Sequence, residues 1–165
     1  MTFEFRKMHL DEAEQAVAME SICFPPHEQN PAEAVRAAVR EANDTTICAI
    51  DPATGKLAGM IMGLATDDEH FRDDFLSTPA LHNPGGKNVM ITGVEVLPEY
   101  RRQGLASEMM RRYLSAEKAK GRACAVLTCL DDKVAMYEKM GYTDFGLSAS
   151  VWGGEQWHEM RQELN

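Results

Sequence analysis

The sequence predicts an α/β (α+β) protein in which helices flank one mixed β-sheet. Segments that alternate like strands and segments with helical periodicity are interleaved along the whole chain. Their order, βααβββαβαββ, lacks the regular βαβ repeat of an all-parallel sheet. The segment ACAVLTCL at 123–130 is almost entirely apolar, which is typical of a strand buried on both faces of a sheet.

The first third of the chain predicts a strand followed by two helices. TFEFRKM at 2–8 alternates like a strand, and residues 10–23 have helical periodicity. FPPHEQN ends this helix, because consecutive prolines cannot continue it. Asn30 and Pro31 are the residue types of a helix N-cap and a first helical position, so a second helix is predicted over 31–43. The predicted apolar stripe of the first helix consists of Leu10, Ala13, Val17 and Ile22.

The middle third predicts a hairpin, a long loop and a further strand. TTICAI at 45–50 and LAGMIMGLA at 57–65 are typical of two strands, joined by the turn DPATGK. Residues 66–87 are polar and contain at most one short helix, and a loop of that length is usually functional or mobile. NVMITGVEVLP at 88–98 is rich in β-branched residues and is stopped by its proline.

The last third predicts two helices and three strands. A helix over 104–120 ends at Gly121, a residue favoured just after a helix, and the buried strand at 123–130 follows. Asp131 can cap a helix that runs to residue 140 and ends at Gly141. YTDFGLSAS and EQWHEMRQEL predict the last two strands, joined near Gly153.

Length and composition indicate one globular domain over residues 1–165. The chain is long enough for a substantial core, and 44% hydrophobic with 26% charged residues is an ordinary globular composition. No segment reaches the roughly 20 apolar residues of a membrane span, and the N-terminus lacks the apolar stretch of a signal peptide. We therefore expect a cytoplasmic protein without a membrane partner, either a monomer or a homodimer.

Charge and cysteine usage exclude two further classes. The net charge of −9 repels phosphate backbones, so we expect no nucleic-acid partner. The four cysteines show no C-x-x-C spacing, and the five histidines are scattered. We therefore expect reduced, mostly buried thiols and no metal site.

The segment EYRRQGLA, between a predicted strand and a predicted helix, carries the first functional signal. The first backbone N–H groups of a helix have no partner within it, and the helix dipole places partial positive charge there. Small residues let an anion approach this backbone, and arginine supplies counter-charge. The segment fits a pyrophosphate, although such a loop can also be only a turn.

Together with a second motif, this segment resembles the GNAT family of N-acetyltransferases. The two stretches are VEVLPEYRRQGLA and, further along, MYEKMGY. The first matches the family's acyl-CoA-binding motif at Val94, Val96, Pro98, Arg101, Gly104 and Ala106. The second matches its Y-E-x-x-G-[FY] signature at Tyr137, Glu138 and Gly141. The resemblance implies a mixed, mostly antiparallel sheet whose fourth and fifth strands splay apart, and acetyl-CoA as co-substrate without a metal.

Looser patterns resemble the arylalkylamine branch of this family: CFPPHE, STPALHNPGG and WGGEQWHEM. The resemblance implies an enzyme that transfers acetyl from acetyl-CoA to a small primary amine by direct attack. Arylalkylamines are the first expectation, and polyamines or other alkylamines are the second. The alternatives are a protein or peptide N-acetyltransferase and a non-catalytic acyl-CoA-binding sensor.

The resemblance also implies which residues hold acetyl-CoA. The main chain around residues 94–96 would pair with the pantetheine arm, and the loop from residue 101 would hold the pyrophosphate. The implied cofactor-binding residues are Val94, Glu95, Val96, Arg101, Arg102, Gln103, Gly104, Leu105, Ala106 and Ser107.

Amine acetylation requires a base, hydrogen-bond donors and an acid. An alkylamine with a pKa near 10 is only about 0.1% neutral at neutral pH, so a proton must be removed before the nitrogen attacks. Tyr137 matches the family tyrosine that faces the sulfur and is the expected acid. Because Val134, Tyr137 and Met140 repeat at helical spacing, Tyr137 can also be a core residue.

The base is less well defined. Met90 and Thr92 occupy the positions of two histidines in the vertebrate enzymes of the resembled branch, so that pair is missing. Glu28 is the expected replacement because insect-type relatives carry a glutamate in this loop, and His27 is adjacent with a suitable ordinary pKa. Glu28 can instead lie in a solvated loop. Glu95 is a third candidate, but strand alternation places it opposite Val94 and Val96.

The remaining candidates concern the amine pocket and a possible nucleophile. Cys129, at the end of the buried strand, is either an acyl-accepting thiol or, as the family favours, a packed core residue. Trp152 and His158 are weaker candidates near the C-terminus. The expected substrate-binding residues are Phe24, Pro25, Thr92 and Trp157.

Overall fold

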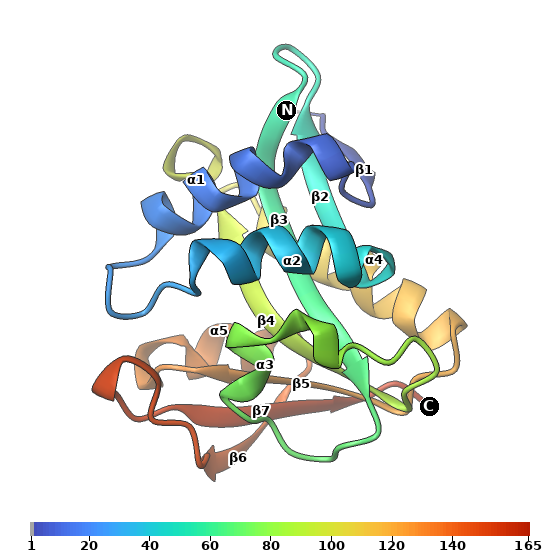
Figure 1. The fold of residues 1–165 in the computed structure, drawn as a ribbon, viewed down its shortest axis with the longest axis vertical. Helices are drawn as coiled ribbons and strands as arrows, with labels where there is room; N and C mark the ends of the chain where they lie inside the picture. Colours follow the sequence, from blue (N-terminus) through green and yellow to red (C-terminus); the bar gives the residue numbers. More distant parts are fainter. Residues whose placement is uncertain (1) are drawn as a thin grey trace.

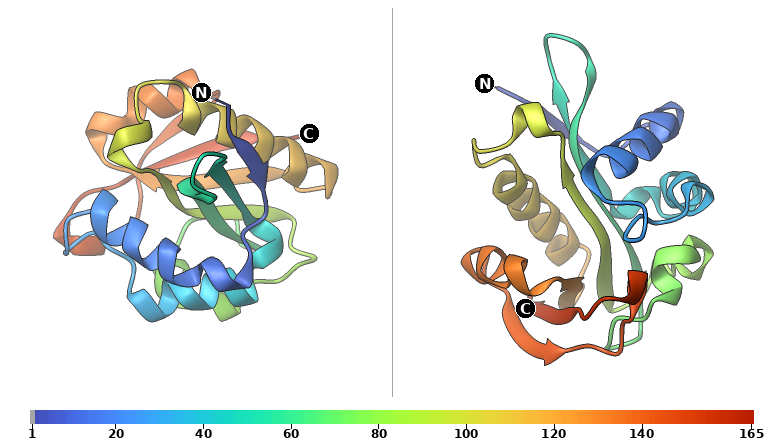
Figure 2. Two further views of the ribbon diagram at one scale, coloured as in Figure 1. Left: turned by 90° about the horizontal axis from the view of Figure 1, so that it is seen from above. Right: turned by 90° about the vertical axis from the view of Figure 1, so that its left-hand side faces the viewer.

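A seven-stranded sheet separates two layers of helices in the computed structural model, which describes residues 2–165 (Figure 1). Helices α1, α2 and α3 cover one face of the sheet, and α4 and α5 cover the other (Figure 2). The strands are β1 (Glu4–Arg6), β2 (Thr46–Asp51), β3 (Lys56–Thr66), β4 (Asn88–Val96), β5 (Cys124–Cys129), β6 (Thr143–Leu147) and β7 (His158–Glu163). The helices are α1 (Ala13–Cys23), α2 (Ala32–Glu41), α3 (Asp74–Ser77), α4 (Leu105–Ala119) and α5 (Val134–Lys139).

The order of strands and helices confirms the predicted α/β (α+β) class. The strand order across the sheet is β1-β2-β3-β4-β5-β7-β6, and every pairing is antiparallel except β4 with β5. The predicted hairpin is β2 with β3. The predicted long loop contains α3 and a short 3-10 helix at Pro79–Leu81, one short helix more than expected.

Two local predictions about the first two helices are wrong. Leu10 and Ile22 are exposed, and the buried face of α1 is formed by Ala16, Met19 and Glu20. Ala13 and Val17 of the predicted stripe do pack against the core, whereas Leu10 precedes α1 and Ile22, five residues after Val17, is off helical spacing. Asn30 does not cap α2, since no side-chain cap is present there and its amide instead donates to the Thr92 carbonyl at 3.2 Å.

The core consists of apolar clusters on both faces of the sheet. Beneath α4 and α5 lie residues such as Ile61, Met109 and Tyr113. Beneath α1 and α2 lie Met19, Val35 and Met60, and a third cluster lies beneath α3. These clusters fix the helices on either side of β4 and β5, so the position of the two strands is determined from both faces.

The two central strands separate soon after they begin to pair. β4 and β5 share only three residue pairs, Asn88 with Cys124 through Met90 with Val126. On its other edge β4 stays paired with β3 as far as Val96, with one register shift at which Thr92 is the extra residue. An extra residue bends a strand. The bend at Thr92 therefore accompanies the splay that the family resemblance implies.

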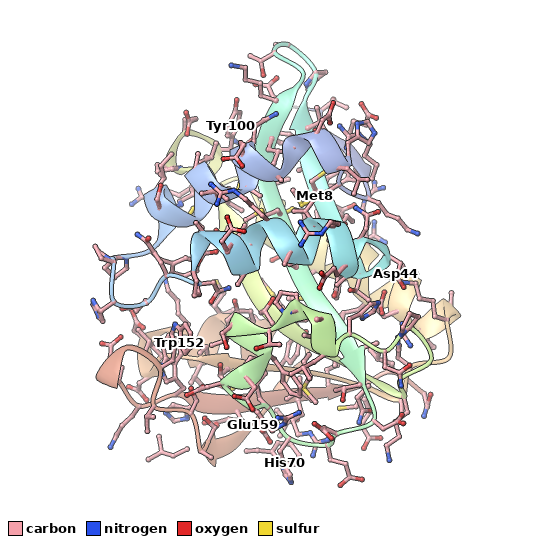
Figure 3. All side chains as sticks on the ribbon, viewed as in Figure 1. Met8, Asp44, His70, Tyr100, Trp152 and Glu159 are labelled. Atoms are coloured by element: carbon pink, nitrogen blue, oxygen red, sulfur yellow. The ribbon has the colours of Figure 1, made fainter. Side chains whose placement is uncertain are left out.

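The long loop between β3 and β4 packs against the sheet rather than standing free. The backbone N–H of Phe71 donates to Glu159 Oε1 of β7 at 2.9 Å, and His70 Nδ1 lies 3.0 Å from Glu159 Oε2 (Figure 3). Phe71 and Phe75 are buried and their rings meet edge-on. The loop therefore packs against β7 as one wall of the structure.

A buried ion pair attaches the end of this loop to α4. Arg122 donates to Glu117 Oε1 at 3.1 Å and to the carbonyls of Pro84 and Gly86 at 2.8 and 2.6 Å. Both charged side chains are almost fully buried. Lys120 Nζ also lies 2.6 Å from Glu117 Oε2, so removing Arg122 leaves Glu117 with one cation and leaves the Pro84 and Gly86 carbonyls without their donor. Losing these buried bonds is costlier than losing a surface pair.

We predict that Arg122→Met lowers the free energy of unfolding by about 3 kcal/mol. Urea unfolding followed by circular dichroism measures this change. Arg40→Met, on the exposed end of α2, is the matched control and changes stability by less than about 0.5 kcal/mol. Equal stability of the two variants would contradict a structural role for the buried pair.

Candidate active site

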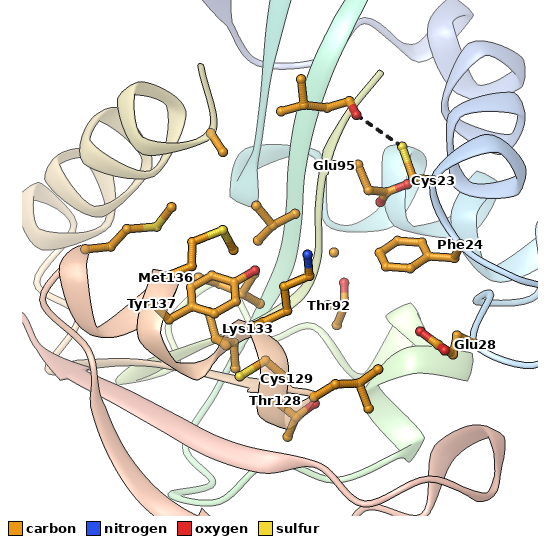
Figure 4. A pocket seen from close by; sticks show the side chains of 18 of the residues that line it. Cys23, Phe24, Glu28, Thr92, Glu95, Thr128, Cys129, Lys133, Met136 and Tyr137 are labelled. Atoms are coloured by element: carbon orange, nitrogen blue, oxygen red, sulfur yellow. Dashed lines mark hydrogen bonds between the residues drawn. The ribbon is translucent and has the colours of Figure 1, made fainter. Parts of the chain in front are cut away.

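A cavity of about 480 Å³ opens where β4 and β5 separate. Figure 4 shows Tyr137 and Met136 on one side and Cys23, Phe24 and Glu28 on the other. Thr92 and Glu95 of β4 lie between the two sides in the same view. The cavity therefore joins the ends of α1, β4, β5 and α5, which are distant in the sequence.

The cavity contains most of the predicted site residues. Those that line it are Phe24, Glu28, Thr92, Val94, Glu95, Val96, Arg101, Arg102, Gly104, Leu105, Ala106, Ser107, Tyr137 and Trp157. Three predicted residues, Pro25, His27 and Gln103, do not line it. His27 nevertheless contacts Glu28, with Nε2 lying 3.3 Å from Oε2.

One end of the cavity is suited to an anion. Gly104, immediately before α4, has a φ of 77°, a conformation that costs residues with a Cβ roughly 1 kcal/mol or more. The N–H groups of the first turn of α4 have no carbonyl one turn earlier in the helix to bind. Within residues 2–165, neither Arg101 nor Arg102 has a carboxylate within ion-pair distance. Backbone donors and two uncompensated cations thus meet at one place in an acidic protein.

A small acidic cluster with a histidine forms another part of the site. His27 Nε2 lies 3.3 Å from Glu28 Oε2 and 3.5 Å from Glu155 Oε2. Side-chain nitrogen and oxygen atoms of the three residues thus lie within 4.8 Å of one another. Burial, together with the neighbouring carboxyl of Glu155, raises the pKa of the Glu28 carboxyl. The sequence predicted scattered histidines, and Glu155 was not among its candidates.

The C-terminal segment closes over the loop that carries Glu28. Trp152 Nε1 donates to the Glu28 carbonyl at 3.2 Å, and Trp157 Nε1 donates to the Trp152 carbonyl at 2.8 Å. Both indoles line the cavity together with Phe24. An aromatic wall therefore borders Glu28.

Tyr137 is both a core residue and a cavity residue. Its ring packs edge-on against Tyr142 with centroids 5.8 Å apart, and 7% of the residue is exposed. Burial raises the pKa of the Tyr137 hydroxyl above its ordinary value, and the nearby Cys129 and Glu95 raise it further. The hydroxyl therefore keeps its proton at neutral pH, and the same shift makes it a weaker acid than an ordinary tyrosine.

The other candidate nucleophile and base positions are less favourable. Burial raises the pKa of the Cys129 thiol to about 12, so the thiolate needed for nucleophilic attack is scarce at neutral pH. Met90 is fully buried in the cluster beneath α3. His158 lies at 3.1 Å from Asp144 on the outer pair of strands and does not line the cavity.

The cavity also contains groups that sequence reasoning missed, above all Glu20. Glu20 is 4% exposed, lines the cavity next to Glu95, and accepts a hydrogen bond from the Asn30 backbone N–H at 2.9 Å. Helical spacing from Ala13 and Ala16 places Glu20 on the apolar face of its helix. A charged residue on an apolar stripe is the signal that was available. For Lys133 and Asn30, which also line the cavity, we find no such signal.

Comparison with known proteins identifies the family. The model of the acetyltransferase (GNAT) family matches residues 12–142. The chain belongs to the GNAT family. Serotonin N-acetyltransferase of Mesocricetus auratus is 33% identical over 113 residues, which are 67% of this chain and 52% of that protein. An uncharacterized N-acetyltransferase of Streptomyces coelicolor is 40% identical over 73 residues, 41% of this chain and 17% of that protein. The chain thus matches about half or less of the length of these relatives.

Solved structures show the same fold as this GNAT chain. The loading GNATL domain of CurA from Lyngbya majuscula has a TM-score of 0.85 at 14% identity, covering 99% of this chain and 98% of that one. The putative acetyltransferase yncA from Salmonella typhimurium, solved with acetyl-CoA, has a TM-score of 0.67 at 12% identity, covering 100% and 95%. None of the helices within residues 2–165 combines the length and apolar character that crossing a membrane requires.

We predict that Glu155→Gln lowers the pKa of the Glu28 carboxyl towards its ordinary value. The substitution removes a like charge without removing the side chain, and it leaves burial as the main cause of the raised pKa. Nuclear magnetic resonance titration of labelled glutamate carboxyls measures the shift. Glu33→Gln, on the exposed start of α2, is the control and leaves Glu28 unchanged. An unaltered Glu28 titration in Glu155→Gln would contradict the coupling.

Proposed function

We propose that this GNAT chain acetylates a small primary amine with acetyl-CoA, arylalkylamines being the first candidates. The observation that carries the proposal is the cavity between β4 and β5, which has anion-binding groups at one end and carboxyls with aromatic side chains at the other. A phosphate-bearing donor and a cationic aromatic acceptor have the complementary properties.

Acetyl-CoA fits the residues that are present. Beyond Met90 the edge of β4 that faces β5 has no strand partner within residues 2–165, which leaves main-chain groups around Val94 and Val96 for the pantetheine arm. Arg101, Arg102 and the first turn of α4 would hold the pyrophosphate. When bound, acetyl-CoA supplies an activated acetyl group and a thiolate leaving group.

Glu28 is the proposed base and Tyr137 the proposed acid. A carboxyl whose pKa is raised is a stronger base than an ordinary one, and it accepts a proton from an ammonium ion more readily. His27, which is half exposed and contacts Glu28, can pass that proton to water. Tyr137 retains a proton that it can give to the sulfur. The high pKa of Cys129 favours direct attack by the amine over an acyl-cysteine.

We rank arylalkylamines before other amines because aromatic side chains form part of the cavity wall. Phe24, Trp152 and Trp157 are three aromatic side chains on the same side as Glu28. Aromatic faces bind both aromatic rings and ammonium groups. Polyamines are the second candidates, since Glu20, Glu28 and Glu95 give the cavity three carboxyls. The four free thiols are consistent with a reducing compartment such as the cytoplasm.

We predict that Arg101→Ala weakens CoA binding about tenfold. An arginine without a carboxylate partner is available for the phosphates, and one charge-assisted hydrogen bond of that kind is worth roughly 1.5 kcal/mol. Isothermal titration calorimetry with CoA measures the affinity. Arg111→Ala, whose guanidinium is paired with Glu108 on α4, is the matched control. Equal affinity of both variants would place the phosphates elsewhere.

We predict that the enzyme releases thiol from acetyl-CoA with tryptamine and phenylethylamine, and that Tyr137→Phe and Glu28→Gln each lower kcat about 100-fold. A colorimetric thiol assay with these amines, spermidine and a lysine peptide measures the preference. Tyr142→Phe keeps the neighbouring ring and is the control for Tyr137→Phe.

Three outcomes of this assay would change the proposal. Full activity of Glu28→Gln would exclude Glu28 as the base. Turnover of the peptide alone would favour a protein acetyltransferase. CoA binding without turnover of any amine would favour an acyl-CoA sensor.

A further inference from the structure

The buried carboxyls of Glu20 and Glu95 lie together at the inner wall of the cavity. Glu95 is 2% exposed, and neither of its carboxyl oxygens has a hydrogen-bond donor within residues 2–165. Glu20, on α1, is 4% exposed and receives only the Asn30 backbone N–H. α1 contacts β4 at this point, where Cys23 donates to the Val96 carbonyl, and Glu20 is a neighbour that raises the pKa of Glu95. Two unpaired charges in such a place are prohibitively costly, so the pair holds a proton.

The shape of β4 makes room for this pair. A Cβ at position 93 would lie 2.7 Å from Glu95 Oε2, so the Glu95 carboxyl lies directly against the backbone of Gly93. Glu95 thus lies flat along its strand, beside the bend at Thr92, instead of extending away from the sheet. Only glycine at position 93 permits this placement. The strand is therefore built to keep the carboxyl at the cavity wall.

The pair is electrostatically linked to the proposed acid. The Glu95 carboxyl contributes to the raised pKa of Tyr137, whereas Glu28 does not. The pKa of Glu28 itself depends on Glu155, His27 and Asp132. The cavity therefore contains two separate proton-accepting groups. One includes a half-exposed histidine, and the other is almost fully buried.

The stoichiometry of amine acetylation requires two such groups. A primary ammonium ion carries three protons on nitrogen and the amide product carries one, so two protons leave the nitrogen. One is lost before the nitrogen can attack, and the other after the N–C bond has formed. One proton must also reach the departing sulfur, so the net release is a single proton.

We propose that Glu20 and Glu95 act as one unit that takes the second proton from the acceptor nitrogen. This inference rests on the proposed function and assigns the first proton to Glu28, which exchanges with water through His27. As the carbon–sulfur bond breaks, Glu95 passes the shared proton to Glu20 and takes the second proton from the nitrogen, and Tyr137 gives its own proton to the sulfur. The carboxyl pair then returns a proton to the Tyr137 oxygen, so the site ends in its starting state.

Other charged or titratable groups near the pair do not replace it. Cys23 of α1 donates to the Val96 carbonyl at 3.5 Å, and burial and Glu95 raise the pKa of its thiol. Arg101 donates to the same carbonyl at 2.8 Å and is exposed. Lys133 lines the cavity from the start of α5 as a cation and cannot take a further proton while charged. Of the groups here that can accept a proton, the carboxyl pair thus has the least access to water.

The decisive experiment uses two amine substrates that differ in basicity. Phenylethylamine is mostly protonated at neutral pH, whereas fluorine lowers the amine pKa of its β,β-difluoro analogue, so that this acceptor enters already neutral. We expect the fluorinated amine to restore kcat in Glu28→Gln, because the first proton is no longer present. We expect Glu95→Gln to lower kcat about 100-fold with both acceptors, because the second proton must still leave.

Two further measurements separate catalysis from folding. Glu95→Gln mimics a protonated carboxyl and is expected to fold, and the infrared band of a protonated carboxylic acid in the free wild-type enzyme at neutral pH should be lost in this variant. Glu20→Gln removes a like charge and lowers the pKa of Glu95. When kcat is measured as a function of pH, its fall on the acid side should therefore move to lower pH. Glu14→Gln, on the exposed face of α1, is the matched control and changes neither readout.

The outcomes distinguish this inference from the proposed function. Rescue of Glu95→Gln by the fluorinated amine, full activity of that variant with both acceptors, or absence of the protonated-acid band in wild type would each overturn the role of the pair. Failure of wild-type enzyme to acetylate any amine would overturn the proposed function and the proton transfer together. The infrared band would then still decide whether the pair holds a shared proton.

Discussion

The separation of β4 from β5 is the constraint on which the rest of the site depends. After three residue pairs the strands diverge, while β4 remains attached to β3 up to Val96. A parallel pair normally satisfies its main-chain groups along its whole length. Here the bend at Thr92 leaves a cavity in the middle of the sheet, and the packed helices on both faces keep it open. The site is thus built from backbone that would otherwise be hidden in a sheet.

The charges around this opening divide it between two ligands. Arg101, Arg102 and the start of α4 present positive charge at one end, in a chain whose net charge is −9. Glu28 presents a carboxyl at the other end, and the Glu20–Glu95 pair lies between, near the Val96 carbonyl to which Cys23 and Arg101 both donate. Burial and like-charge neighbours raise the pKa of these carboxyls. A carboxyl with a raised pKa accepts a proton from an amine more readily than a strongly acidic one does. One cavity therefore presents cationic groups and carboxyls at separate places.

Sequence patterns predicted the fold and the donor end better than the acceptor end. The order of strands and helices follows from local periodicity, and the Arg101–Ala106 segment depends on residues adjacent in the chain, so both were accessible. The splay came only from the family resemblance. Glu20 and Glu155 join the site through contacts across the fold, and Asn30 leaves its expected cap position to bind Thr92. Glu20 had one local signal, its place on the apolar face of its helix, whereas the contacts of Glu155 and Asn30 have no signal in local spacing. Glu95 lies on the face opposite Val94 and Val96, as strand alternation predicted: it lies beside α1 (Figure 4), whereas Val94 and Val96 pack against the cluster beneath α4 and α5.

A crystal structure of the protein with a covalent bisubstrate analogue, CoA joined through an acetyl bridge to tryptamine, tests this arrangement of the two substrates. The arrangement places pantetheine against the main chain of Val94 and Val96, pyrophosphate at residues 101–107, and the indole beside Phe24 and Trp157. The bridging nitrogen should lie between Tyr137 and the carboxyls of the cavity. An analogue bound outside the opening between β4 and β5, or bound with the indole among Arg101 and Arg102, would contradict it.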